Sequence, residues 1–111
     1  MRRSTARRAR EEKKKELGLK KYNFIFVGRL ILFKNVSVIL AAFHKIHAVS
    51  KDWGVIILGD GDELDGMKEY CRLHGLTGVY FESGKSWYEV PEWFALADVF
   101  VLPSYSEPWG L

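Results

Sequence analysis

Two cations follow a predicted strand at a spacing that suits the binding of phosphate groups. Arg29 comes directly after Gly28, and Lys34 lies five residues farther along, just before a predicted helix. A guanidinium fork matches phosphate oxygens, and the amino end of a helix also favours anions. Fixed cations at such a point would stabilise a departing phosphate group more in the transition state than in the ground state. The spacing alone is equally compatible with two surface charges in a strand-to-helix loop.

A second candidate residue is the acid Glu107, in the terminal segment Pro103–Leu111. This segment follows the apolar stretch Ala97–Leu102, which is typical of a strand in a sheet that is covered on both faces. The carboxyl end of such a strand is where an open α/β sheet keeps its ligands. Without further motif information, Glu107 could also be an exposed loop acid.

A third candidate is the predicted turn Gly59-Asp60-Gly61-Asp62, which resembles parts of two ligand-binding motifs but completes neither. Its D-x-D portion is similar to a metal-binding motif, and its G-x-G portion is half of a dinucleotide fingerprint. Leu64 stands where the third glycine would be, and Cys71 stands where a calcium loop needs a glutamate. We therefore interpret the glycines as turn geometry and Asp62 as the cap of the following helix.

The elements that must position these residues alternate between strand and helix. Short apolar runs predict strands at 22–27, 55–58, 79–81 and 99–102. Apolar residues at helical spacing predict helices over 36–46, from 62 to the residue before Gly75, and over 87–97, the last with Val90, Phe94 and Ala97 facing inward. This order predicts an α/β fold with a Rossmann-like parallel sheet and flanking helices.

In combination, Gly28-Arg29-Leu-Ile-Leu-Phe-Lys34, Gly59–Gly61 and Pro103–Leu111 resemble the carboxyl-terminal nucleotide-sugar-binding domain of the group 1 glycosyltransferases, which have the GT-B fold and retain anomeric configuration. The resemblance covers roughly residues 22–111. The chain matches every fixed position of the family pattern G-R-x-x-x-x-K, and this match favours a functional role for both cations.

The resemblance implies roles for individual residues. Glu107 resembles the first glutamate of the family motif E-x-F-G-x-x-x-x-E, in which Trp109 replaces the common Phe and Gly110 is retained. The implied catalytic residues are Arg29, Lys34 and Glu107, and the implied donor-binding residues are Gly28, Gly59, Gly61, Ser104, Trp109, Gly110 and Leu111. The substrate would be a nucleoside-diphosphate sugar, and no metal or other cofactor is expected.

The resemblance also implies an incomplete enzyme. We expect residues 1–21 to form a basic linker helix and residues 22–111 to form a partial nucleotide-sugar-binding domain, with the acceptor domain and the motif's second glutamate missing. Such a piece would be inactive alone and prone to self-association through an uncovered sheet edge. A nucleotide-sugar epimerase of the same fold is an alternative. We expect a cytoplasmic protein whose full-length parent associates at most peripherally with the inner membrane face.

Charge is distributed unevenly along the chain. Residues 1–21 hold ten Lys or Arg against three Glu, whereas residues 22–111 hold seven against eleven acids. A basic-arm nucleic-acid binder is therefore an alternative of another class. The basic segment has no interleaved aromatic residues and carries compensating glutamates, so we expect no nucleic-acid partner. His44, His47 and His74 have no partner acids at metal spacing, and we expect them on helix surfaces or ends.

We predict that labelled duplex DNA and RNA do not bind the chain specifically at physiological salt, because the basic segment pairs Glu with Lys along its own helix. Titration followed by fluorescence anisotropy measures this. Micromolar binding that weakens steeply with salt and disappears when residues 2–15 are deleted would favour the nucleic-acid alternative.

Overall fold

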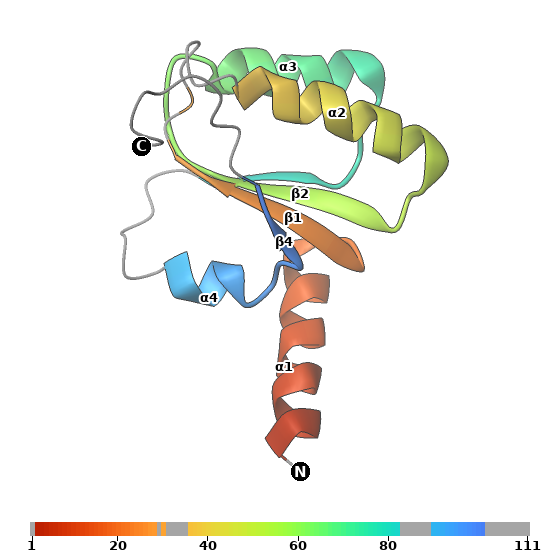
Figure 1. Cartoon of the computed structure of the whole chain (residues 1–111), viewed down its shortest axis with the longest axis vertical. Coiled ribbons are helices and arrows are strands. Elements are labelled where there is room, and N and C mark those ends of the chain that lie inside the picture. Colours follow the sequence, from red (N-terminus) through yellow and green to blue (C-terminus); the bar gives the residue numbers. More distant parts are fainter. Residues whose placement is uncertain (1, 29, 31–35, 83–89, 102–111) are drawn as a thin grey trace.

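A computed structural model describes residues 2–28, 30, 36–82 and 90–101 of the chain. The elements run in the order α1 (Arg2–Leu17), β1 (Tyr22–Val27), α2 (Val36–Val49), β2 (Trp53–Leu58), α3 (Leu64–His74), β3 (Val79–Glu82), α4 (Val90–Phe94) and β4 (Val99–Phe100). The strands form one sheet in the order β3-β2-β1-β4, and each neighbouring pair is parallel. Helices α2 and α3 cover one face of the sheet and α4 lies on the other (Figure 1). The predicted parallel α/β fold is confirmed.

The two faces of the sheet bury separate apolar clusters because side chains alternate along each strand. Val55 and Ile57 of β2 face the larger cluster, with Phe43 of α2 and Met67 of α3. Ile56 and Leu58 face the smaller cluster, which contains Ile25, Trp93 and Leu96. Strands covered on both faces are nearly continuous apolar runs, which is the pattern that the sequence of β1 and β2 shows.

Strand β2 begins two residues earlier than the apolar run alone predicts, at Trp53. Its register pairs Tyr22 with Trp53 and Val27 with Leu58. The Trp53 ring stacks on Phe24 with 4.6 Å between centroids. Gly54 lies in this added part of the strand, where the packing leaves no room for a side chain. A Cβ there would come within 2.7 Å of both Asn23 Oδ1 and the Gly78 carbonyl oxygen.

The predicted helix cap at Asp62 is wrong. Helix α3 begins at Leu64, and the residue at its cap position is Glu63, which makes no side-chain capping hydrogen bond. A backbone group takes the place of a side-chain cap here: the Leu64 N–H donates to the Gly61 carbonyl oxygen at 3.2 Å. The predicted stop is confirmed: Gly75 adopts a left-handed conformation with φ of 62°.

The predictions for the region of α4 and β4 need two corrections. Phe94 is not an inward residue, because α4 ends there and the turn that follows buries Leu96 beside Trp93 instead. The predicted buried strand is, in the described residues, a short strand at one end of the sheet, with Val99 and Phe100 42% and 47% exposed. Residues 87–89, the beginning of the predicted helix, and Leu102, the end of the predicted strand, lie outside the described residues.

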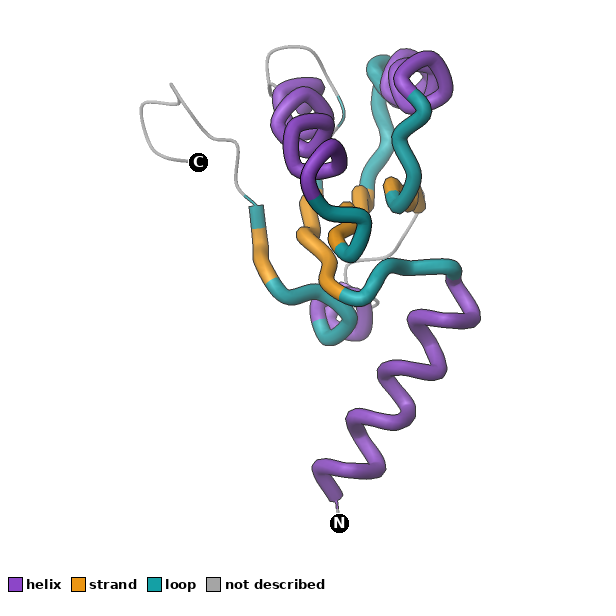
Figure 2. Tube along the Cα trace, turned by 90° about the vertical axis from the view of Figure 1, so that its right-hand side faces the viewer, coloured by secondary structure: helices purple, strands orange, loops and turns teal. Residues whose placement is uncertain are grey.

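Helix α1 ends at Leu17 and is followed by Gly18 with φ of 74°, so the helix stops before the end of the expected segment 1–21. It projects from the body of the molecule (Figures 1 and 2). One residue departs from the expected solvated helix: Lys14 is buried, and its ammonium group donates to the Lys21 carbonyl oxygen at 2.8 Å. None of the described helices is long and apolar enough to cross a membrane.

His47 lies in the last turn of α2, a helix end as expected, but its side chain is buried. Lys51 Nζ lies 3.0 Å from its Nδ1 and donates to it, and Nε2 lies 3.0 Å from Thr77 Oγ1. The Thr77 N–H donates to Nε2 as well, at 3.3 Å. Burial, with the charge of Lys51 as the next cause, lowers the pKa of His47 from its ordinary value of 6.5.

We predict that the free energy of unfolding is highest above the ordinary histidine pKa of 6.5 and declines as the pH falls below it. The unfolded chain takes up a proton there that folded His47 resists, so acid favours the unfolded state. Urea unfolding at several pH values between about 5 and 7.5 measures the slope. His47→Gln should flatten this slope, and the control His74→Gln, at an exposed position, should keep it. Equal slopes in the wild type and His47→Gln would contradict the assignment.

Candidate functional site

The carboxyl ends of β1, β2 and β3 meet at one edge of the sheet, where Gly28 and Gly59 follow their strands directly. The Gly28 N–H donates to the Leu58 carbonyl oxygen at 3.0 Å, and the Gly59 N–H donates to the Glu82 carbonyl oxygen at 2.9 Å. These bonds continue the sheet past the ends of β1 and β2. The structure thus places two of the predicted site residues side by side.

Leu30 joins the loop after β1 to the loop after β2. Its N–H donates to the Asp60 carbonyl oxygen at 2.9 Å, and its own carbonyl oxygen accepts from the Glu63 N–H at 2.8 Å. Its side chain is fully buried in the larger core cluster. Sequence reasoning overlooked Leu30, although an apolar residue directly after Arg29 in a loop was an available signal.

Close packing of these loops explains two of the predicted glycines. A Cβ added to Gly59 would overlap the carbonyl oxygen of Gly28, and one added to Gly61 would overlap the backbone of Leu30. Backbone meets backbone at both positions, so nearby side chains could not make room. The interpretation of Gly59 and Gly61 as turn geometry agrees with this packing. At Gly28 a Cβ would lie 3.1 Å from the ring of Phe26.

A carboxylate from β3 lies at the same edge of the sheet. The Tyr80 hydroxyl donates to Glu82 Oε1 at 2.8 Å, and the Tyr80 ring packs against Trp93 with 5.4 Å between centroids. Burial raises the pKa of Tyr80, and the hydrogen bond and negative charge of Glu82 raise it further. Tyr80 therefore stays protonated and can orient Glu82. No motif in the sequence indicated this pair.

The remaining predicted site residues lie outside the described residues. They are Arg29, Lys34, Ser104, Glu107, Trp109, Gly110 and Leu111. Arg29 lies in the sequence between Gly28 and Leu30, whose backbones are both held by hydrogen bonds to the next loop or strand. Within the described residues, no three His, Cys, Asp or Glu side chains gather as a possible metal site.

The site therefore has two loops that are fixed to one another at the carboxyl edge of a parallel sheet. Such an edge presents backbone N–H groups and the amino ends of following helices to a ligand. In open α/β sheets this edge commonly binds phosphate-bearing ligands.

The fold of the chain is similar to that of solved glycosyltransferase structures. The C-terminal domain of a group 1 family glycosyl transferase, LpcC from Francisella tularensis, matches with a TM-score of 0.75 and 23% identity, over 89% of this chain and 54% of that one. The lipopolysaccharide outer core galactosyltransferase WaaB matches with a TM-score of 0.57 and 24% identity, over 73% of this chain and 23% of that one. TarM of S. aureus matches with a TM-score of 0.64 and 10% identity, over 74% of this chain and 17% of that one.

At these identities the structural likeness shows the fold alone, a Rossmann-like α/β domain of the GT-B type. The chain spans about half the length of the first structure and less than a quarter of the other two. No curated protein matches the sequence significantly.

Family membership rests on a sequence comparison. The profile of the family described as "Glycosyl transferases group 1" matches residues 7–111, which include both fixed loops and nearly all of the chain. The chain belongs to the group 1 glycosyl transferases.

Proposed function

We propose that the chain forms the donor-binding part of a glycosyltransferase that moves a sugar from a nucleoside-diphosphate sugar to an acceptor. The observation that carries this proposal is the close packing of the loops after β1 and β2, here called the locked loops, at the carboxyl edge of the sheet in a chain of this family. Gly28, Gly59 and Gly61 leave backbone, rather than side chains, at the edge where a diphosphate would lie.

In this proposal the cations act on the leaving group. When the glycosidic bond breaks, the bonding electrons stay on the phosphate oxygen, so the nucleoside diphosphate gains negative charge. Arg29 and Lys34 would stabilise that charge most strongly in the transition state. They supply the positive charge that a metal provides in other phosphate chemistry, so the proposal includes no metal.

The terminal segment would complete the donor site. Glu107 would contact the donor sugar, and Ser104, Trp109, Gly110 and Leu111 would bring the backbone near the diphosphate. The TarM structure is a complex that contains UDP, which supports a nucleoside diphosphate as ligand. The acceptor would be bound by a second domain of the full enzyme, joined through the basic segment 1–21.

We predict that, in the full enzyme containing this chain, Arg29→Ala or Lys34→Ala lowers the turnover number far more than it raises the donor Michaelis constant. The expected loss is about 2 to 4 kcal/mol of transition-state stabilisation, as for one preorganised electrostatic donor. Steady-state kinetics measure both parameters. Arg29→Lys should restore activity only in part, because an ammonium group lacks the guanidinium fork. Near-normal turnover in both alanine variants would identify these residues as surface charges.

A second prediction concerns the locked loops. Gly59→Ala should lower the free energy of unfolding by about 1 to 3 kcal/mol, because the methyl group forces two backbones apart, and should lower turnover in the full enzyme as well. Gly66→Ala is the matched control: Gly66 lies in α3, and an added Cβ meets nothing within 4 Å. It should raise stability by about 0.5 to 1 kcal/mol and leave turnover unchanged. If both variants are equally active, the loop contact does not support catalysis.

A further inference from the structure

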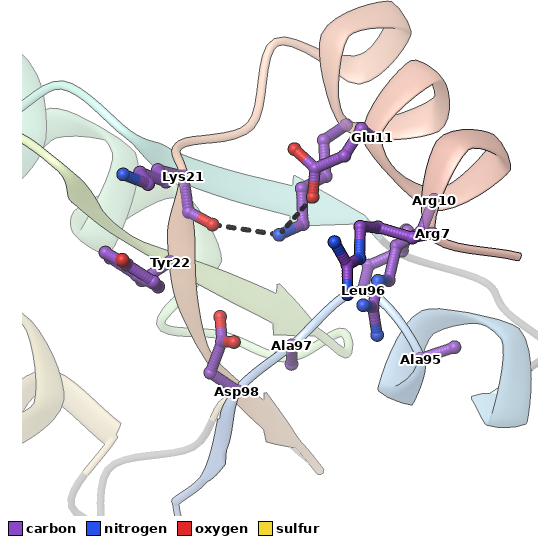
Figure 3. Close-up of a pocket in the computed structure, with 10 residues that line it drawn as sticks. Arg7, Arg10, Glu11, Lys21, Tyr22, Ala95, Leu96, Ala97 and Asp98 are labelled. Carbon is purple, nitrogen blue, oxygen red and sulfur yellow. Dashed lines mark hydrogen bonds and ion pairs between the residues drawn. The ribbon is translucent and has the colours of Figure 1, made fainter. Parts of the chain in front are cut away.

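A second concave site lies at the opposite edge of the sheet, where β1 begins. This cavity has a volume of about 490 Å³ and opens between α1 and the turn after α4 (Figure 3). Its lining residues come from one face of α1, from the start of β1 and from the turn before β4, and are Arg7, Arg10, Glu11, Lys14, Lys21, Tyr22, Ala95, Leu96, Ala97 and Asp98. The six residues of β1 separate it from Gly28, which corresponds to about 20 Å.

Three of the charged groups in the cavity already have partners in the protein. The ammonium group of Lys14 donates to the Lys21 carbonyl oxygen at 2.8 Å and lies 3.5 Å from a Glu11 carboxylate oxygen. Asp98 Oδ2 accepts the Asn23 N–H at 2.8 Å. Lys14 therefore holds α1 to the residue before β1, and Asp98 holds the turn before β4 to β1.

Arg7 and Arg10 differ from these residues. No hydrogen bond or ion pair joins either guanidinium group to another residue in the described part of the chain, and both side chains extend from α1 toward Leu96 in Figure 3. They are three positions apart, so they lie on neighbouring turns of one helix face. The ammonium group of Lys21 points away from Arg7 and Arg10 in Figure 3, and its Nζ lies 5.4 Å from the centre of the Tyr22 ring.

We propose that this cavity binds the phosphate group of a phosphorylated molecule between Arg7 and Arg10. Guanidinium groups bind phosphate oxygens in a bidentate geometry, and two of them with no described protein partner could bind different oxygens of one phosphate group. The apolar floor of Ala95, Leu96 and Ala97 would contact the rest of the ligand. The volume lies within the range of about 300 to 1,000 Å³ that is typical of small-molecule sites.

Binding there would change how α1 is held. The helix projects from the body, and its described apolar contact with the core is Leu17 at its end. A phosphate bound by Arg7 and Arg10 and resting on residues 95–98 would add a second point of attachment, two turns nearer the amino end. Ligand binding should therefore slow hydrogen exchange in α1.

The test is a titration of the isotope-labelled chain with inorganic phosphate at constant ionic strength, followed by amide chemical shifts. We expect saturable shifts at Lys21, Tyr22 and residues 95–98, separate from any at Gly28, Gly59 and Gly61. The double variant Arg7→Gln, Arg10→Gln should weaken binding by about tenfold or more. The double variant Arg8→Gln, Lys15→Gln removes the same charge from α1 outside the cavity lining, and should bind within about twofold of the wild type.

A parallel experiment measures binding to phosphatidylcholine vesicles with and without phosphatidylglycerol. It distinguishes a lipid headgroup from a small phosphorylated molecule as the ligand. Vesicle binding that depends on Arg7 and Arg10 but not on Arg8 and Lys15 supports the site with a lipid headgroup as ligand. Binding of free phosphate without vesicle binding supports it with a small phosphorylated molecule. Absence of saturable shifts at residues 95–98, or equal weakening by the two double variants, would overturn the proposal. Because the donor edge has its own reporter amides, either outcome leaves the proposed function to be judged separately.

Discussion

The backbone contact between the loops after β1 and β2 is the constraint on which the candidate donor site depends. Leu30 makes it, with one hydrogen bond to each side of the Gly59–Glu63 turn and a side chain buried in the core. Burial anchors the loop, and the hydrogen bonds set its distance from the neighbouring turn. Gly59 and Gly61 follow from that distance, since a Cβ at either position would overlap the facing backbone. A rigid edge of this kind can hold catalytic charges in place before the ligand arrives, which is what electrostatic stabilisation requires.

Strand β1 runs from the basic cavity, where Tyr22 begins the strand, to the candidate donor site, where Gly28 follows it. It pairs with both β2 and β4, and its second residue, Asn23, is fully buried. The Asn23 N–H donates to the Asp98 carboxylate, and the Asp98 N–H donates back to the Asn23 carbonyl oxygen at 2.7 Å. This reciprocal pair fixes the start of β4 and one wall of the basic cavity. Asn23 Oδ1 is buried without a hydrogen-bond partner in the described part of the chain, and Gly54 packs against it where any larger residue would clash.

The departures from sequence-based prediction have more than one cause. Helical spacing assigned Phe94 to the core, but α4 ends at Phe94 and Leu96 is buried instead. His47 lies in the last turn of its helix, among the expected surface or end positions, but its ring is buried and contacts Thr77, thirty residues away. The position before a helix assigned a capping role to Asp62, but the carbonyl oxygen of Gly61 accepts the Leu64 N–H. Local patterns describe which side of an element is apolar, not what the neighbouring elements bring to it.

The sequence by itself determined the alternation of strands and helices, the limits of β1, the stop at Gly75, and the family pattern that contains Arg29, Lys34 and Glu107. These features are local: apolar periodicity, left-handed glycines and fixed motif spacings all lie within a few neighbouring residues. Only the tertiary structure decided why Gly59 and Gly61 must be glycines, that Leu30 joins two loops, that Tyr80 orients Glu82, and that Arg7 and Arg10 border a cavity with residues 95–98. The Tyr80–Glu82 hydrogen bond depends on two residues on the same face of one strand. The other features depend on segments that the parallel sheet brings together across long crossover connections, and no short-range pattern encodes that distance.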